Sequence, residues 1–279
     1  MAYKTILTVA TDQTDLKTLI ESACALAVRE DAHLDVLCLG LDRTQVGYYY
    51  GGGSALVYQE TVDRAQEDAE RIETETKALL EGRALRWSTE ATIAQIGTVV
   101  NPVGMRARFS DLVVLPKPYG EGRGIEDEAI VEAALFDGRV PVLIVPERGL
   151  TEKTGKRIVL AWNQSDEALT AARQSLPLLT RAETVNIAII DPPQHGPERS
   201  DPGGPLSQFL TRHGVRAEVT VLARTTPRIS DILTRHAMDQ SADLIVMGAY
   251  GHSRFREAIL GGATRNMLEQ SDIAVLLAH

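Results

Sequence analysis

The chain of 279 residues contains the same pattern twice. The run TVATDQTD at residues 8–15 aligns with VLAWNQSD at residues 159–166, and Asp111–Leu115 aligns with Asp243–Met247. From the second pair of anchors the register continues without a gap to the closing apolar run of each copy. A repeat of this length indicates that one folding unit is used twice, which constrains the fold more than any other feature of the sequence.

The seam between the two copies is polar and contains Gly149 and Gly155, a composition typical of a short linker. We therefore expect an N-terminal domain of residues 1–147, a linker at residues 148–155 and a C-terminal domain of residues 156–279. The offset between aligned positions shrinks along the chain. This indicates an insertion in the first copy, around residues 48–54 and the charged segment after them.

Each copy alternates short apolar runs with helical patterns. Strands separated by helices form parallel βαβ units, and runs that are apolar on both faces indicate a sheet covered on both sides. The sequence therefore predicts an α/β, doubly wound fold in two copies. The expected strands lie at residues 6–10, 34–39, 85–91, 112–115 and 140–145, and at residues 157–161, 185–190, 215–222, 244–247 and 273–277. The expected helices of the first copy lie at residues 16–27, 57–80, 99–108 and 130–136.

Composition excludes several classes of function. The 29 basic and 38 acidic residues give a net charge of −9, which argues against a general nucleic-acid or anionic-membrane surface. The longest apolar runs are far shorter than the roughly 20 residues that span a bilayer. The first residues lack the apolar core of a signal peptide. Because two cysteines cannot form a disulfide framework, we expect a reducing, cytoplasmic location.

Glycines mark the end of the fourth strand in the second copy. Gly248 and Gly251 follow that strand, and Gly261 and Gly262 come where the last helix should begin. Two such turns can bring several backbone N–H groups to one point, and a helix N-terminus favours negative charge. The sequence therefore predicts an anion-binding loop here, although glycines that serve only as turn formers would give the same spacing.

This pattern, which follows Asp-Leu-Ile-Val-Met and precedes a helix and a final apolar strand, resembles the universal stress protein family. The resemblance covers essentially the whole chain as two tandem copies. It implies that each copy is a five-stranded parallel sheet with helices on both faces, of the adenine-nucleotide α-hydrolase type. It also implies ATP, with or without Mg²⁺, as the ligand of the glycine loop.

The resemblance assigns roles to residues of the second copy. Asn163 occupies the position of a family aspartate and keeps a hydrogen-bond acceptor there. Ile189 would offer its backbone to adenine, and His252 would either touch a phosphate or lie in solvent. Gly262 stands where the family usually has Ser or Thr, a loss for which Thr264 could compensate. The glycine-loop residues expected to contact phosphates and ribose are Gly248, Gly251, Gly261, Gly262 and Ala263.

The first copy lacks this loop. Pro116, Tyr119, Ala129 and Ile130 stand opposite Gly248, Gly251, Gly261 and Gly262 of the second copy. Proline has no N–H, and larger side chains occupy the space of phosphates. We therefore predict a degenerate N-terminal site that binds no nucleotide. Asp12 keeps the family's carboxylate, which we interpret as a cap of a helix or turn.

No enzyme signature is present. The sequence has neither a P-loop nor a Rossmann fingerprint, its histidines show no metal spacing, and no nucleophile with a base is visible. We expect no catalytic residues and no metal site, and a stress-response regulator or sensor. A scaffold or small-ligand sensor without nucleotide and a slow ATPase stay open as alternatives. We also expect the halves to pair through antiparallel Val142–Val145 and Ala274–Leu277, with further homodimerisation open.

Overall fold

The computed structural model describes residues 2–12, 14–43, 55–192, 201–249 and 262–279. The chain forms two compact units, an N-terminal unit of residues 3–140 and a C-terminal unit that comprises residues 141–279 and the first two residues. Within the described ranges, no helix combines the length and the apolar character that a bilayer crossing requires.

The described strands of the N-terminal unit form a parallel sheet in the order β3-β2-β1-β4. Parallel pairing requires a crossover between neighbouring strands, and helices supply these crossovers. The strands are β1 (Thr5–Ala10), β2 (His33–Asp42), β3 (Arg86–Gln95) and β4 (Leu112–Pro116).

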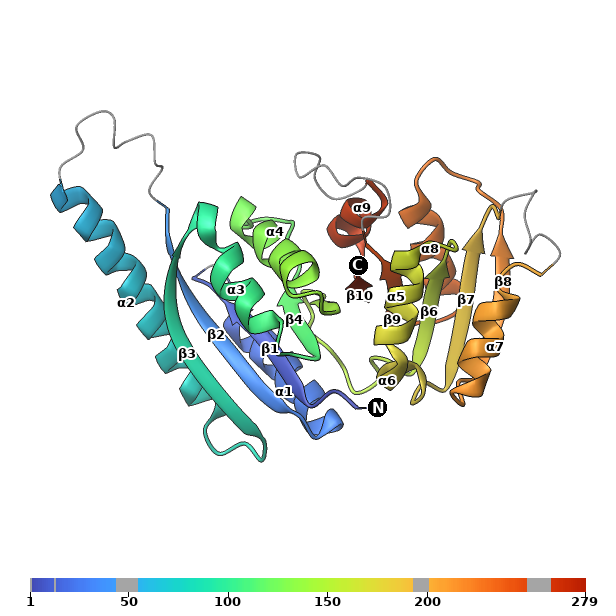
Figure 1. Ribbon diagram of the computed structural model, residues 1–279, viewed down its shortest axis with the longest axis horizontal. Helices are drawn as coiled ribbons and strands as arrows, with labels where there is room; N and C mark the ends of the chain where they lie inside the picture. Colours follow the sequence, from blue (N-terminus) through green and yellow to red (C-terminus); the bar gives the residue numbers. More distant parts are fainter. Residues whose placement is uncertain (1, 13, 44–54, 193–200, 250–261) are drawn as a thin grey trace. The chain divides into compact units, whose positions relative to one another are not determined.

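Helices cover both faces of this sheet (Figure 1). On one face α2 packs against β2, where Cys38 Sγ lies 3.7 Å from Thr76 Oγ1. On the other face lie α3 and α4. The helices are α1 (Leu16–Glu30), α2 (Ala55–Leu80), α3 (Val100–Ala107) and α4 (Ile125–Glu132).

The ends of two helices follow local side-chain chemistry. Helix α1 begins after Asp15, whose carboxylate accepts from the Thr18 N–H at 3.2 Å. Helix α4 begins five residues before the predicted position and ends in a π-helical turn, Ala133–Asp137. The reason is a cap at its start, where the Gly124 N–H donates to Asp127 Oδ2 at 2.9 Å. Apolar spacing alone did not reveal this cap.

The C-terminal unit has the strand order β5-β10-β9-β6-β7-β8. All of these neighbours pair in parallel except β5, which runs antiparallel to β10, with Val142 opposite Leu277 and Ile144 opposite Val275. The strands are β5 (Val142–Val145), β6 (Arg157–Trp162), β7 (Thr184–Ile190), β8 (Ala217–Leu222), β9 (Leu244–Gly248) and β10 (Ala274–Ala278).

Helices again lie on both faces of the strands, with α5 and α7 on one face and α8 and α9 on the other (Figure 1). The predicted α/β fold class is therefore confirmed, while β5, assigned by sequence to the first copy, belongs to the C-terminal unit. The described helices are α5 (Asp166–Gln174), α6 (Leu176–Leu179), α7 (Gly204–Arg212), α8 (Ile229–Asp239) and α9 (Gly262–Gln270).

Candidate functional site

The predicted site lies where the strand order of the C-terminal unit reverses. Strands β6 and β9 are parallel neighbours, with Leu160 opposite Val246, and the strands that come next in the chain, β7 and β10, lie on opposite sides of this pair. Ligands of open α/β sheets bind outside the carboxyl ends of strands at such a point. Trp162 ends β6 and Gly248 ends β9, so both lie at this carboxyl edge.

Gly248 allows a close approach of helix α5. A Cβ atom at Gly248 would lie 2.6 Å from the backbone N of Ala168 and 2.6 Å from the backbone C of Glu167. Because these are backbone atoms, any side chain at this position would displace the first turn of α5. The glycine therefore has a packing role in the described residues, beside the ligand contact that the sequence predicts.

Asn163 shapes the turn between β6 and α5. Its Oδ1 accepts from the Ser165 N–H at 3.1 Å, and the Ser165 hydroxyl accepts from the Ala168 N–H at 3.1 Å as the cap of the helix. Between these two residues Gln164 has a φ of 65°, in the left-handed region. The amide oxygen of Asn163 is thus engaged within the protein, while its residue surface is exposed.

Ile189 lies beside Trp162 in the pairing of β7 with β6. Its side chain is 3% exposed and packs beneath Gly203, where an added Cβ would lie 2.7 Å from Ile189 Cδ1. Gly203 has a φ of 83°, a conformation that favours glycine, and precedes α7. Only the backbone of Ile189 is therefore available at the edge of the sheet.

The start of α9 presents backbone to solvent. Gly262 and Ala263 are exposed, and an added Cβ at Gly262 would meet no atom within 4 Å. The first N–H groups of a helix have no partner within the helix, and they favour anions. Thr264, in contrast, is 3% exposed, so its hydroxyl lies inside the fold. Of the other predicted residues, Gly251, His252 and Gly261 lie outside the described residues.

Trp162 is a residue of this edge that the sequence reasoning missed. Its indole Nε1 is buried and has no hydrogen-bond partner among the described residues. The available signal was its place in the repeat, where it aligns with Thr11, one residue before the Asn163 position.

The corresponding edge of the N-terminal unit is nearly filled. Its cavity measures only about 10 Å³ and is lined by Thr11, Pro116 and Ile130, among others. Asp127, also in the lining, is 5% exposed, and its burial raises the pKa of its carboxyl group. Pro116 and Ile130 thus stand in the crevice where the other copy has Gly248 and Gly262.

An arginine joins three elements at the same edge. Arg43, which follows β2, donates to both carboxylate oxygens of Asp12 at 2.9 and 2.8 Å and to Glu126 Oε1 at 3.2 Å. The hydrogen bonds with Asp12, followed by its charge, raise the pKa of Arg43 further above its ordinary value. The interpretation of Asp12 as a cap is therefore wrong, because its carboxylate binds this guanidinium.

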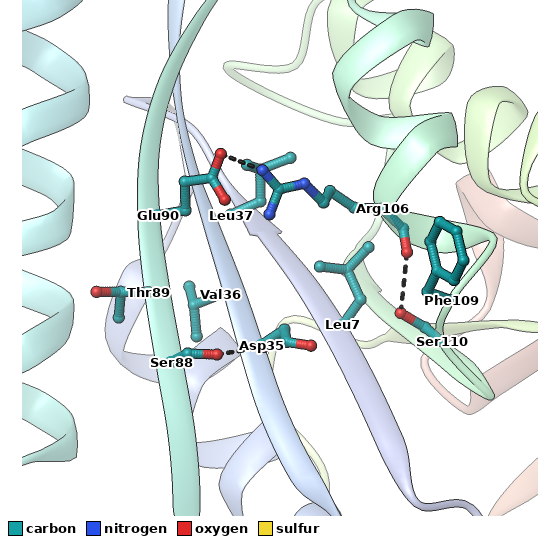
Figure 2. Close-up of a pocket in the computed structure, with 10 residues that line it drawn as sticks. All are labelled: Leu7, Asp35, Val36, Leu37, Ser88, Thr89, Glu90, Arg106, Phe109 and Ser110. Carbon is teal, nitrogen blue, oxygen red and sulfur yellow. Dashed lines mark hydrogen bonds and ion pairs between the residues drawn. The ribbon is translucent and has the colours of Figure 1, made fainter.

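A larger cavity of about 270 Å³ lies on the face of the N-terminal sheet (Figure 2). Arg106 of α3 reaches Glu90 of β3 across it, and the Ser88 hydroxyl donates to Asp35. His33 Nε2 lies 2.9 Å from Ser88 Oγ and 3.3 Å from Asp35 Oδ1. In a catalytic triad the carboxylate and the hydroxyl bind different ring nitrogens, so this cluster lacks the geometry of an activated serine.

Across the part of the chain that the structure describes, no three or more His, Cys, Asp or Glu side chains gather closely enough to hold a metal ion. Cys24 and Cys38 are buried and form no disulfide.

Comparisons with known proteins match the C-terminal part of the chain to one family. The family model of the Universal stress protein family matches residues 155–279. The Universal stress protein Slr1230 of Synechocystis is 33% identical over 73 residues, which are 26% of this chain and 24% of that protein. The chain therefore matches about a quarter of the length of this relative.

One solved structure with a similar fold covers nearly the whole chain. A universal stress protein from Archaeoglobus fulgidus has a TM-score of 0.71 at 14% identity and covers 98% of this chain and 95% of its own. A universal stress protein solved in complex with cAMP covers 44% of this chain and 97% of its own, at 20% identity and a TM-score of 0.34. Residues 155–279 of this chain form a domain of the universal stress protein family.

Proposed function

We propose that the C-terminal unit binds an adenine nucleotide, with ATP as the first candidate, at the carboxyl edge of β6 and β9. The observation that carries the proposal is the start of α9, where Gly262 and Ala263 are exposed, together with the glycine that ends β9. A helix N-terminus of this kind supplies N–H donors and a favourable potential for phosphate.

Different residues of this site would contact different parts of the nucleotide. Gly248, Gly251, Gly261, Gly262 and Ala263 would hold phosphates and ribose through backbone N–H groups, with His252 near the phosphates. The backbone of Ile189 would meet adenine, and Asn163 would act through the part of its amide that Ser165 does not use. A Mg²⁺ ion, if it accompanies ATP, would be carried by the phosphates, since no carboxylate belongs to this set.

The N-terminal unit is proposed to bind no nucleotide. The small volume of its crevice and the side chains of Pro116 and Ile130 support this asymmetry. The pairing of the two halves, possible further homodimerisation and a cytoplasmic location belong to the same proposal. The pairing is supported by β5, which the sequence repeat assigns to the first copy and which runs antiparallel to β10 of the second. The location is supported by the two thiols that form no disulfide.

The biological role proposed is that of a stress-response regulator or sensor that works without catalysis. One observation favours the alternative of a scaffold that binds no nucleotide. Thr264 is buried and Gly262 has no hydroxyl, so neither replaces the hydroxyl that the family pattern supplies. A slow ATPase would require turnover above background that disappears in Gly251→Val.

Native protein should be purified without added nucleotide and denatured, and the released small molecules should be identified by mass spectrometry. We expect one adenine nucleotide per chain. Two per chain would contradict the asymmetry between the units. No released nucleotide, together with an unchanged melting temperature on addition of ATP and Mg²⁺, would favour the scaffold, since a ligand that binds only the folded state stabilises it.

A further inference from the structure

One polar group of the C-terminal unit has no structural explanation. The Nε1–H of Trp162 is buried and donates to no atom in the described ranges. Native proteins pair nearly all buried N–H groups, because an unpaired donor has lost its water without gaining a partner. The indole N–H of Trp162 therefore lacks a hydrogen-bond acceptor in the described part of the protein, and a bound ligand could supply one.

The repeat indicates where this side chain lies. In the N-terminal unit Thr11 lines the crevice at the carboxyl edge together with Pro116 and Ile130. The residues aligned with these three are Trp162, Gly248 and Gly262. Trp162 thus occupies a crevice-lining position of the fold, and glycines take the places of the other two lining residues.

The chemistry of the indole limits the partner. An indole N–H only donates, so its partner must be an acceptor, and the ring adds a broad apolar face for another aromatic ring. We propose that Trp162 binds the nucleoside part of the ligand, its Nε1–H donating to a purine ring nitrogen or a ribose oxygen. This inference rests on the proposed nucleotide site. It adds a side-chain contact with the nucleoside, which the glycines of that site cannot make.

Fluorescence tests the contact without any change at Trp162. The chain has two tryptophans, and Trp87 lies on β3 in the other unit. In Trp87→Phe protein, Trp162 is therefore the sole source of tryptophan emission. Titration with ATP should change the intensity or the wavelength of this emission. Isothermal titration calorimetry on the same sample measures binding independently, and Trp87→Phe should bind ATP as tightly as the unaltered chain.

A second experiment tests the hydrogen bond. Trp162→Phe keeps an aromatic ring but removes the donor, and we expect ATP affinity to fall by about tenfold. ATP analogues that lack one ring nitrogen, the 1-, 3- and 7-deaza forms, identify the acceptor. The analogue that lacks it should bind the unaltered chain and Trp162→Phe equally. If all three keep the difference, the acceptor is a ribose oxygen, which 2′-deoxy-ATP and 3′-deoxy-ATP then test.

The outcomes separate the two proposals. If the unaltered chain binds no nucleotide in calorimetry, the proposed function itself fails. If it binds ATP while the emission of Trp162 stays constant and Trp162→Phe binds equally, only the role of Trp162 is overturned. Tighter binding by Trp162→Phe, or by Trp162→Thr, which restores the residue of the first copy, would show that the indole blocks the crevice and would also overturn it.

Discussion

Arg43 and Asp12 form a two-pronged ion pair, with guanidinium-to-carboxylate distances of 2.9 and 2.8 Å. The same guanidinium reaches Glu126, whose side chain is 6% exposed, at 3.2 Å. Replacing Arg43 leaves a buried carboxylate without its cation, and such losses are much larger than those of surface pairs. We expect Arg43→Met to lower the free energy of unfolding by about 1–3 kcal/mol.

Urea denaturation measures this effect. Arg71, which pairs with Asp68 and Glu75 on the exposed side of α2, is the matched control, and Arg71→Met should cost less than about 1 kcal/mol. Adding Glu126→Gln to Arg43→Met should recover part of the loss. Equal losses from both arginine variants would show that Arg43 is an ordinary surface residue.

Alanine substitutions at Gly248 and Gly262 should affect different properties, the first the stability of the fold and the second the affinity for ATP. Gly248→Ala puts a Cβ 2.6 Å from backbone atoms of α5, and overpacking of this kind costs about 1–3 kcal/mol. Gly262→Ala meets no atom within 4 Å, so its stability should change by less than about 0.5 kcal/mol. Its new methyl group would crowd a phosphate, however, and we expect about tenfold weaker ATP binding.

Urea unfolding and calorimetry on both variants check this pair. A stable Gly248→Ala would contradict the close approach of α5. Unchanged ATP affinity in Gly262→Ala would remove α9 from the proposed site.

His236 should make stability depend on pH. Its Nε2 lies 2.8 Å from Asn186 Oδ1, and Asn186 Nδ2 donates to Thr220 Oγ1 at 2.9 Å. Because Asn186 uses its N–H₂ on Thr220, its oxygen accepts from a neutral His236 that is protonated at Nε2. Burial of this ring lowers the pKa of His236 in the folded chain.

The lowered pKa of His236 makes the folded chain less stable at acidic pH. Unfolded chains take up the proton first as pH falls through about 6.5, so the contribution of His236 to stability is complete above that pH and decreases below it. Urea unfolding at several pH values should show a steeper loss for the unaltered chain than for His236→Gln. Parallel curves for the two proteins would exclude His236 as the source.

The two thiols should be inert in the folded chain. Burial raises the pKa of Cys24, and it raises the pKa of Cys38 to about 11. Only the thiolate attacks a disulfide reagent, so neither residue should react at a pH of about 8 until the chain unfolds. Colour from Ellman's reagent should appear in urea with two thiols per chain and should be nearly absent without it. Rapid reaction of one thiol in native protein would show that its surroundings open.

The sequence predicted the elements of the fold better than their ends. The apolar spacing of Leu16, Leu19, Ile20, Ala23 and Ala27 predicts the helix; the last four are buried in α1, while Leu16 at its start is half-buried. The start of α4 escaped prediction because it depends on a hydrogen bond between Gly124 and Asp127 that apolar spacing does not encode.

The candidate site was predictable only in part. Strand ends and glycines can be found from one sequence: Gly248 ends β9 at the predicted edge, and Gly262 begins α9. The link from Arg43 to Asp12 and Glu126 joins residues 31 and 83 positions apart, so spacing along the chain could not reveal it. Trp162 escaped because a tryptophan that ends a strand usually indicates core packing, and its unpaired N–H is visible only in three dimensions.

The pairing of β5 with β10 decides where this protein can be divided. A C-terminal fragment cut at residue 156, which the repeat would suggest, lacks Val142–Val145 and leaves the apolar strand Ala274–Ala278 with one unpaired edge. Such an edge recruits strands from other molecules and promotes aggregation. A fragment that starts at Pro141 keeps β5 on this edge of β10, so four residues that the repeat assigns to the first copy are required to complete the fold of the second unit.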